Sequence, residues 1–549
     1  MANEGVAETE LQRAKRLIRA RLAFNYMNGA TQLAQQLSSF QAFGSWRLFE
    51  TFESRIEAVT ADQIQSVVRK YFRPENRTVV QYIPTPVAQL ALVDPAKLEV
   101  ERTLPAASEV RVDPRPTPAS SRKADSKPQR FRLSNGITLI VRQVTGSSAV
   151  AFHGMALPGA GQVPHLRATA AMVADMLPRG TQKRTQQQIA DQLDGLGAQI
   201  SFQLADQSLE FPGAAFKEDL PVVLGLLAEQ LREPTFDQAE FEKARQQFLS
   251  GLRQERASPA DAAYRLVRNS MLPADHPFTR TDWDTLERRV REMGVADLRT
   301  FHERYYRPDN LTLAVVGDLN PNQVREMVEV AFSGWKVQGP KPTVRTVQAP
   351  QPAARTLIYG TSERSEVQVD IGIPTPLVHS HPDYHAARLL SQILGGAPLW
   401  SSRLGAEVRD KKGFAYGVWS YLVGETYPGY IEFTFGTAPQ NADKAIDAAT
   451  AVLERFVREG PTNEEVERAK NFLIGNFAVY NQTNQHIAES LAVAEFLQGG
   501  MEYLERRSSM LRGVTRGQIQ EAARKYLRIQ DATVAIAGTY SGTRQTTSK

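Results

Sequence analysis

The chain contains no cysteine, which excludes disulfide bonds, thiolate metal ligands and a cysteine nucleophile. Its 8 histidines occur in neither H-x-x-E-H nor H-E-x-x-H, the two short motifs that hold catalytic zinc on a helix. No apolar run approaches the roughly 18 residues that a membrane-spanning helix needs. Lysine and arginine alternate with acidic residues, so a net charge of +5 without a basic block argues against nucleic-acid binding.

What is present is ordinary for a folded protein of several domains. Hydrophobic residues make up 42% and charged residues 23% of the 549 residues. At about 150 residues per domain, this length predicts three or four domains. The first thirty residues form an Arg-rich amphipathic pattern, without the apolar centre of a signal peptide. A cysteine-free chain suits a reducing or an oxidising compartment, so the localisation stays open.

A helix–turn–strand pattern occurs three times along the chain. Its matching tyrosines are Tyr71, Tyr305 and Tyr526, which lie 234 and then 221 residues apart. In each copy an amphipathic helix ends near the tyrosine, a turn with Pro or Asp follows, and an apolar run rich in β-formers comes next. The spacing is that of a whole domain and not of a solenoid repeat.

The first copy is incomplete. Residues 8–84 match residues 462–540 almost element for element, beginning with ELQRAK at 10–15 against EVERAK at 465–470. Nothing in the sequence before residue 8 could supply the remainder of such a domain. We therefore expect residues 8–84 to be the closing third of a domain whose earlier part lies elsewhere.

The two complete copies predict the fold class. The first opens with a strand pair at 131–141 around an Asn135-Gly136 turn. Helical patterns follow, for example at 219–231 and 241–255, before later strands close the sheet. Strands that alternate with runs of amphipathic helices predict an α+β fold with two complete two-layer sandwich domains, in which helices cover one face of a mostly antiparallel sheet.

The stretch AMVAD at 171–175 is the most informative part of the sequence. It lies between GMALPGAG at 154–161 and MLPRGTQKR at 176–184. This frame resembles the segment around the inverted zinc motif H-x-x-E-H of the insulinase/pitrilysin family, peptidase family M16. The resemblance places the first His on Ala171, the Glu on Ala174 and the second His on Asp175.

These residues predict a degenerate zinc site. A methyl group donates no lone pair to zinc, and Asp175 alone supplies at most one of about three protein ligands. The family's third ligand, a Glu roughly 75 residues downstream, falls near Ser250 and Gly251, with Glu255 a few residues further on. We therefore expect no catalytic residue, no metal and no cofactor in this chain.

A second element, RDKKGFAY at 409–416, follows LGGAPLWSSRL at 394–404. It resembles the Arg/Tyr element of the family's C-terminal half, which reaches a peptide held at the zinc of the other half. The resemblance assigns substrate binding to Arg409 and Tyr416, because a guanidinium and a phenol can hold a carbonyl and stabilise an oxyanion. The alternative is a surface arginine and a half-buried tyrosine on a strand.

Two groups of histidines are interpreted as structural. His379, His381 and His385 lie close to Asp383, but Pro382-Asp383 before an apolar run is an ordinary helix start. His165 is interpreted as a loop residue before the degenerate motif and not as a displaced ligand.

The resemblance extends from residue 8 to about residue 540 and divides the chain into six segments. They are the closing part of an otherwise missing M16 domain at 1–84, a Pro-rich linker at 85–129, an N-type M16 domain with the degenerate zinc motif at 130–338, a linker at 339–354, a C-type M16 domain with the Arg/Tyr element at 355–541, and a disordered tail at 542–549.

The resemblance implies the non-catalytic half of a two-half zinc metalloendopeptidase. Such a half closes the proteolytic chamber and binds peptide for a zinc-bearing partner half, either a separate chain in a heterodimer or a missing upstream part. The chain alone is expected to be inactive. The alternatives are an inactive structural subunit, like the core proteins of the respiratory cytochrome bc complex, and a hydrolase with a different site. Relatives suggest a periplasmic or extracytoplasmic location, and a cytoplasmic one is the alternative.

Residues 8–84 also carry apolar side chains without the sheet that such a segment covers. Leu37, Phe40, Phe43 and Trp46 are among them. Exposed apolar area of this size indicates an interaction surface. We expect the chain by itself to aggregate or to bind a partner.

Overall fold

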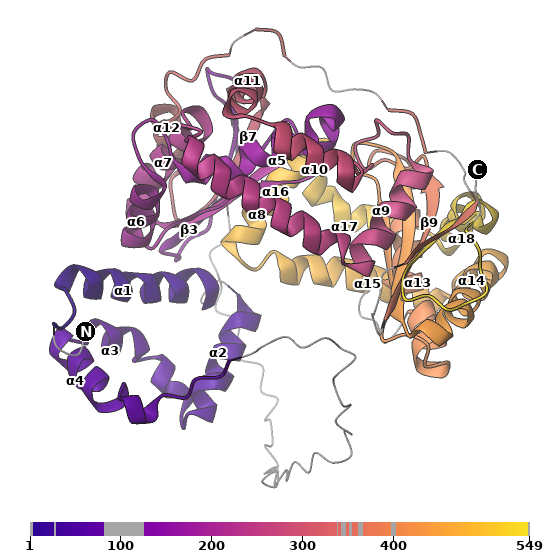
Figure 1. Ribbon diagram of the computed structural model, residues 1–549, viewed down its shortest axis with the longest axis horizontal. Helices are drawn as coiled ribbons and strands as arrows, with labels where there is room; N and C mark the ends of the chain where they lie inside the picture. Colours follow the sequence, from indigo (N-terminus) through magenta and orange to yellow (C-terminus); the bar gives the residue numbers. More distant parts are fainter. Residues whose placement is uncertain are drawn as a thin grey trace.

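Two β-sheets organise the computed structural model (Figure 1). It describes residues 4–26, 29–81, 126–337, 339–341, 347–350, 354–360, 366–396 and 402–546. The strands are β1 (Gln129–Arg132), β2 (Thr138–Gln143), β3 (Ala149–Ala156), β4 (Gln199–Ile200), β5 (Gln203–Leu204), β6 (Leu209–Phe216), β7 (Leu311–Gly317), β8 (Arg355–Gly360), β9 (Val367–Thr375), β10 (Trp419–Val423), β11 (Gly429–Thr437) and β12 (Thr533–Gly538).

Helices make up most of the remaining described chain. They are α1 (Glu8–Arg21), α2 (Ala30–Ala42), α3 (Phe52–Glu57), α4 (Ala61–Tyr71), α5 (Arg167–Met176), α6 (Gln186–Leu196), α7 (Leu220–Arg232), α8 (Gln238–Arg256), α9 (Pro259–Met271), α10 (Trp283–Glu292), α11 (Val295–Tyr305), α12 (Pro321–Ala331), α13 (Tyr384–Gly395), α14 (Ala442–Glu459), α15 (Asn463–Tyr480), α16 (Asn484–Leu497), α17 (Tyr503–Gly513) and α18 (Arg516–Tyr526).

The two sheets have the same plan. The first sheet has the strand order β1-β2-β7-β3-β6-β4, with β5 also on β6, and the second has the order β10-β11-β9-β12-β8. In each sheet the last strand in sequence, β7 or β12, lies inside, antiparallel to one neighbour and parallel to the other. All other pairings are antiparallel. The predicted α+β fold is confirmed.

Helices from the same part of the chain cover one face of each sheet. Leu224 and Leu227 of α7 and Val324 and Val328 of α12 join the core under the first sheet. Under the second sheet the core is formed by α13, α14 and α18, for example by Leu390. This is the predicted two-layer arrangement, since each amphipathic helix buries its apolar stripe on the sheet.

The opposite face of each sheet is covered by a helix from the other half of the chain. Ile487, Ala488, Leu491 and Ala492 of α16 pack on β2, β3 and β7 of the first sheet. Reciprocally, α9 packs its Ala262, Ala263, Val267 and Met271 side against β11 and β12 of the second sheet. Figure 1 shows α16 crossing to β3 and β7, and α9 lying beside β9. Small residues on both helices let the backbones approach closely.

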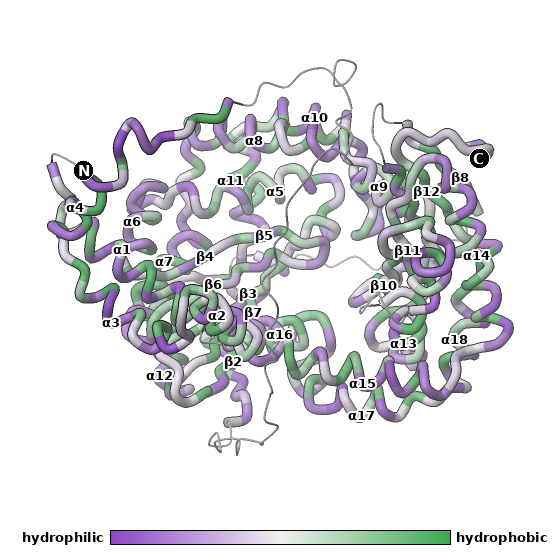
Figure 2. Tube along the Cα trace, turned by 90° about the horizontal axis from the view of Figure 1, so that it is seen from below, coloured by the Kyte–Doolittle hydropathy of each residue, from purple (hydrophilic) through white to green (hydrophobic). Residues whose placement is uncertain are grey.

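The N-terminal helices α1–α4 lie at the end of the molecule farthest from the second sheet (Figures 1 and 2). Their main anchor is α1, whose Arg13 forms ion pairs of 2.9 and 2.6 Å with Asp191 and Asp194 of α6. The ring of Phe24 lies 5.3 Å from that of Phe216 at the end of β6. The segment is thus attached to the first sheet's helices through α1. The helices α2, α3 and α4 contain no buried residue.

Several local predictions hold. The predicted strand pair is β1 and β2, which are antiparallel around Asn135 and Gly136. The predicted helices at 219–231 and 241–255 fall within α7 and α8. Among the described residues, no helix is both long and apolar enough to span a membrane.

The predicted segment boundaries are only partly covered by the described residues. Residues 82–125 of the first linker, and 342–346 and 351–353 of the second, lie outside them. Residues 542–546 of the predicted tail are described, and this part is attached to α14. The backbone N–H of Thr543 donates to Asp443 at 2.7 Å, and Arg544 forms an ion pair with the same carboxylate at 3.3 Å.

A substitution at Gly372 of β9 can test how closely α9 packs on the second sheet. A Cβ at this position would lie 2.5 Å from Cε of Met271 and 2.7 Å from Cγ2 of Val267. Gly372→Val should therefore push α9 off the sheet and lower the free energy of unfolding by about 1–3 kcal/mol. Urea unfolding measures the change. Gly360→Val on β8 is the matched control, because a Cβ there meets nothing within 4 Å, and equal losses in the two variants would contradict the close contact.

Candidate functional site

The degenerate zinc motif lies on α5, between two apolar cores. Ala174 is buried against the first sheet's core, whereas Met172 and Val173 join a separate core with α8, α10 and α11. Ala171 is half-buried and Asp175 is exposed. The structure therefore places the three motif positions on one helix, but two of them present methyl groups, which fit no metal ion.

A guanidinium links the third motif position to the neighbouring helix. Arg179 donates to Asp175 at 3.0 Å and to Gln247 of α8 at 2.6 Å. It also lies 3.9 Å from Glu240, a second residue of α8. A cationic side chain thus joins α5 to α8, the two helices on which the family frame places zinc ligands. Because this side chain is only 13% exposed, it is held in place by its surroundings.

The downstream carboxylate is engaged elsewhere. Glu255 accepts from Arg265 of α9 and, at 3.3 Å, from Nε1 of Trp283. It is eight residues beyond Gln247 on α8, which corresponds to about 12 Å along a helix axis. No group of three or more His, Cys, Asp or Glu side chains suited to a metal occurs in the described ranges.

The structure brings Arg409 and Tyr416 together. Arg409 lies on a π-helical segment, Gly405–Lys411, and its guanidinium carbon is 6.0 Å from the centroid of the Tyr416 ring. That distance is at the outer limit of a cation–π contact. Tyr416 is 84% exposed and precedes β10, so it is neither half-buried nor on a strand. Tyr416 is therefore placed to meet a ligand on the surface, whereas the Arg409 side chain is 20% exposed and its Nε lies 3.7 Å from Asp410.

Buried contacts position this pair. Leu404 and Val408 anchor the π-helical segment in the second sheet's core. Gly413 adopts a φ of +64°, which favours glycine, and turns the chain towards Ala415, which bridges Thr437 of β11. Arg403, just upstream, forms an ion pair with Glu465 at 2.7 Å. The residues from 397 to 401, which include part of the Gly-rich approach, are outside the described chain.

The histidines near α13 form an aromatic cluster. Asp383 directly precedes α13, as the helix-start interpretation predicts. The rings of His379 and Tyr503 are 4.4 Å apart, and His385 stacks on Tyr503. Burial lowers the pKa of both His379 and His385 to about 4. They are neutral at neutral pH and pack as ring systems. His165 lies in a short 3-10 turn.

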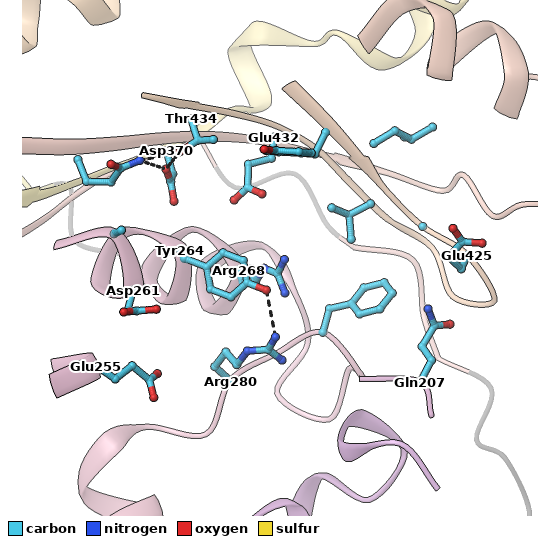
Figure 3. A pocket seen from close by; sticks show the side chains of 17 residues that line it. Gln207, Glu255, Asp261, Tyr264, Arg268, Arg280, Asp370, Glu425, Glu432 and Thr434 are labelled. Atoms are coloured by element: carbon cyan, nitrogen blue, oxygen red, sulfur yellow. Dashed lines mark hydrogen bonds between the residues drawn. The ribbon is translucent and has the colours of Figure 1, made fainter. Parts of the chain in front are cut away.

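Sequence analysis missed a cavity of about 860 Å³ between α9 and the second sheet (Figure 3). Tyr264 and Arg268 of α9 line one side, and strands β9, β10 and β11 line the other. Its charged lining consists of Glu255, Asp261, Arg268, Arg280, Asp370, Glu425 and Glu432. Hydrogen-bond donors and acceptors on both walls could hold an extended peptide backbone.

Arginines on one wall of this cavity share a single carboxylate. Arg280 donates to Asp206 at 3.0 Å and to the hydroxyl of Tyr264 at 3.0 Å, and Arg268 lies 3.7 Å from the same carboxylate. Arg167, outside the cavity lining, also donates to Asp206 at 3.1 Å. Burial opposes ionisation of Asp206, but the hydrogen bond and charge of Arg280 outweigh it and lower its pKa. The arginine side chains of this wall are thus held in fixed orientations.

Two buried carboxylates form the opposite wall. Asp370 of β9 accepts hydrogen bonds from Gln368 at 3.1 Å and from Thr434 at 2.5 Å. Glu432 of β11 is 5% exposed. Burial raises the pKa of both carboxyl groups, and the charge of Asp370 raises that of Glu432 further. The sequence signal for them is slight: one acidic residue within each of two apolar strand patterns.

Comparison with family models identifies the fold and the motif region. The insulinase model, peptidase family M16, matches residues 164–276, which contain the degenerate motif. The model described as peptidase M16 inactive domain matches residues 293–473, which contain Arg409 and Tyr416. Together the two matches span more than half of the sequence. The chain belongs to peptidase family M16.

Curated relatives point to the same family. An uncharacterised zinc protease of Streptomyces coelicolor is 23% identical over 73% of this chain and 87% of its own length. An uncharacterised zinc protease of Bacillus subtilis is 21% identical over 74% of this chain and 97% of its own length. A Helicobacter pylori relative, 22% identical over 67% of this chain and 83% of its own length, is described as a non-peptidase homologue.

Solved structures share the fold. A peptidase M16 inactive domain from Pseudomonas fluorescens superposes with a TM-score of 0.70 at 21% identity, covering 77% of this chain and all of that one. A protease from Helicobacter pylori superposes with a TM-score of 0.66 at 19% identity, covering 75% and 99% of the two chains.

The buried carboxylates predict a pH dependence of stability. Because their pKa values are raised on folding, the folded chain holds protons that the unfolded chain releases above about pH 4. The free energy of unfolding should therefore fall as pH rises from about 4 through the raised pKa values. Glu432→Gln removes one such group and should stabilise the chain by about 1–3 kcal/mol near pH 8 and little near pH 4.

Urea unfolding of both proteins over this pH range measures the difference. The control is Glu454→Gln, an exposed position on α14. A stabilisation by Glu432→Gln that is the same at both ends of the range would contradict the linkage to protonation.

Proposed function

We propose that this chain is the non-catalytic half of an M16-type metalloendopeptidase, which closes the chamber and binds peptide for a zinc-bearing partner half. The contrast between two sites carries the proposal. Arg179 links Asp175 of α5 to α8, and these are the helices on which the family frame places zinc ligands. Arg409 and Tyr416 lie close together in the domain of the second sheet. The first arrangement cannot activate water at a metal, and the second can bind a carbonyl.

The chemistry assigned to each residue follows from its functional groups. Arg409 would hold a peptide carbonyl or carboxylate through charge-assisted hydrogen bonds. Tyr416, whose ring is largely exposed, would donate its O–H to the oxygen that gains charge when water attacks. Zinc bound by the partner half would activate that water. The acidic and basic walls of the cavity between α9 and the second sheet support a role in holding the remainder of the peptide.

The metal content of the isolated chain is the first test. Because Ala171 and Ala174 supply no ligand, the purified chain should retain far less than one zinc per molecule after dialysis. Elemental analysis measures this, and a fluorogenic peptide assay should detect no hydrolysis that EDTA abolishes. Stoichiometric zinc together with EDTA-sensitive cleavage would overturn the proposal in favour of an active hydrolase.

The second test needs the zinc-bearing half. The chain is expressed with an M16 polypeptide from the same genome that carries an intact H-x-x-E-H motif, and peptide cleavage by the complex is measured. Arg409→Ala and Tyr416→Phe should each lower kcat/KM by about a hundredfold or more, the lower end of the range for loss of an oxyanion donor. Complex formation should not change.

The matched control is Arg458→Ala, because the Arg458 side chain is 69% exposed on α14. It should leave cleavage as in the unmodified complex. Turnover unaffected by both Arg409→Ala and Tyr416→Phe would instead favour the structural-subunit alternative.

A further inference from the structure

The N-terminal segment exposes an unusual amount of apolar surface. Eight of the seventeen large hydrophobic side chains exposed in the described chain lie within residues 4–81. Their exposed fractions run from 37% to 87%. They are Leu33, Phe43, Trp46, Val67, Tyr71, Phe72, Val79 and Val80. Such a concentration on one short segment indicates a binding surface.

The internal repeat gives each exposed residue a counterpart in the same chain. The helix α4 matches α11 at an offset of 234 residues and α18 at an offset of 455, with both ends in register. The short 3-10 turn that follows each helix keeps the same offsets: Pro74–Asn76, Pro308–Asn310 and Ile529–Asp531. The three copies are therefore compared residue by residue without a gap.

The helix of each complete copy buries the position that α4 exposes. Val67 is 51% exposed, whereas its counterparts Phe301 and Ala522 are 4% and 1% exposed. Ala522 faces the core under the second sheet, and Phe301 faces the separate core that α11 forms with α5, α8 and α10. The amphipathic face of α4 is thus the face that packs in the other two copies.

The strand position shows the same contrast. Val80 is 87% exposed, and its counterparts Ala314 of β7 and Ala535 of β12 are fully buried. Each counterpart strand lies inside a sheet, between one parallel and one antiparallel neighbour. Residues 77–81 are described without strand pairing. Their unpaired backbone groups and apolar side chains match an interior place in a sheet.

The helix α2 has the place of an exchanged helix. Its residues 30–42 match residues 485–497 of α16 at the same offset of 455. Leu33 and Leu37 fall on Ala488 and Ala492, which α16 buries on the first sheet. No residue of α2 is buried. The apolar stripe of α2 therefore corresponds to the stripe with which α16 covers the sheet of the other domain.

We propose that residues 30–81 form a docking surface for another M16-type polypeptide, one whose sheets lack their own closing strand and exchanged helix. On docking, residues 77–81 enter its sheet between a parallel and an antiparallel strand, α4 packs beneath that strand, and α2 covers the second sheet. The recognition is backbone pairing plus apolar burial, so the inference does not depend on peptide binding by Arg409 or Tyr416.

The test uses the full chain and an M16 polypeptide of the same genome that carries H-x-x-E-H and ends before a closing segment of this type. Light scattering should detect a one-to-one complex. Amide hydrogen exchange at residues 77–81 should slow by about tenfold or more on binding, because these amides gain hydrogen bonds. Unchanged exchange there in a formed complex would overturn the proposal.

A double variant locates the contact. Val67→Lys with Val80→Lys should weaken the complex by about thirtyfold or more, since each places a charge in a buried position. The matched control is Val222→Lys with Val330→Lys, at exposed valines of α7 and α12, which should change affinity less than about twofold. Equal affinity of the double variant and the unmodified chain would also overturn the proposal.

Two further outcomes distinguish docking on an M16 polypeptide from peptide binding and from self-association. Arg409→Ala should form the complex as the unmodified chain does, so a loss of peptide cleavage without a loss of binding concerns only the proposed function. Self-association of the chain that Val67→Lys with Val80→Lys abolishes, without any complex with the M16 polypeptide, would assign the surface to a second copy and overturn the proposal. The exchange measurement needs no variant and holds if the double variant misfolds.

Discussion

The fold depends on a reciprocal exchange of helices, in which each half of the chain places one helix on the sheet of the other half. Each sheet has two apolar faces, and its own helices cover only one. The second face of the first sheet is buried by α16, and that of the second sheet by α9. Removing apolar surface from water is the main favourable term in folding. Each sheet therefore requires the other half of the chain, and this requirement fixes the two lobes side by side.

The same constraint explains the N-terminal segment. In the two complete copies, the closing helix and strand are stable because a sheet receives them. In the first copy the equivalent residues keep the turn and the helix boundaries, including the Thr60–Gln63 capping box that recurs at Thr515–Gln518. Local interactions thus preserve the shape of the segment. The apolar side chains remain exposed, because local structure alone provides nothing on which to bury them.

The exchange also creates the candidate site. Since α9 crosses onto the second sheet, its Arg268 and Tyr264 face the carboxylates of β9 and β11 across the cavity. The family relationship accounts for the shared fold. At the positions where the resemblance places the ligands of H-x-x-E-H, Ala171 and Ala174 carry methyl groups, which have no lone pair for zinc. Arg179 joins the third position, Asp175, to α8. A salt-bridged helix pair needs no metal to hold its two helices together.

The sequence by itself determined the α+β class, the threefold repeat and the absence of zinc ligands at Ala171 and Ala174, because these follow from periodicity and from which atoms a side chain carries. It also singled out Arg409 and Tyr416. The tertiary structure alone decided that α9 and α16 change sheets, that Arg179 reaches Gln247, and that Asp370 lies across from Arg268. These contacts join residues far apart in the chain, and their geometry depends on packing that no local pattern encodes.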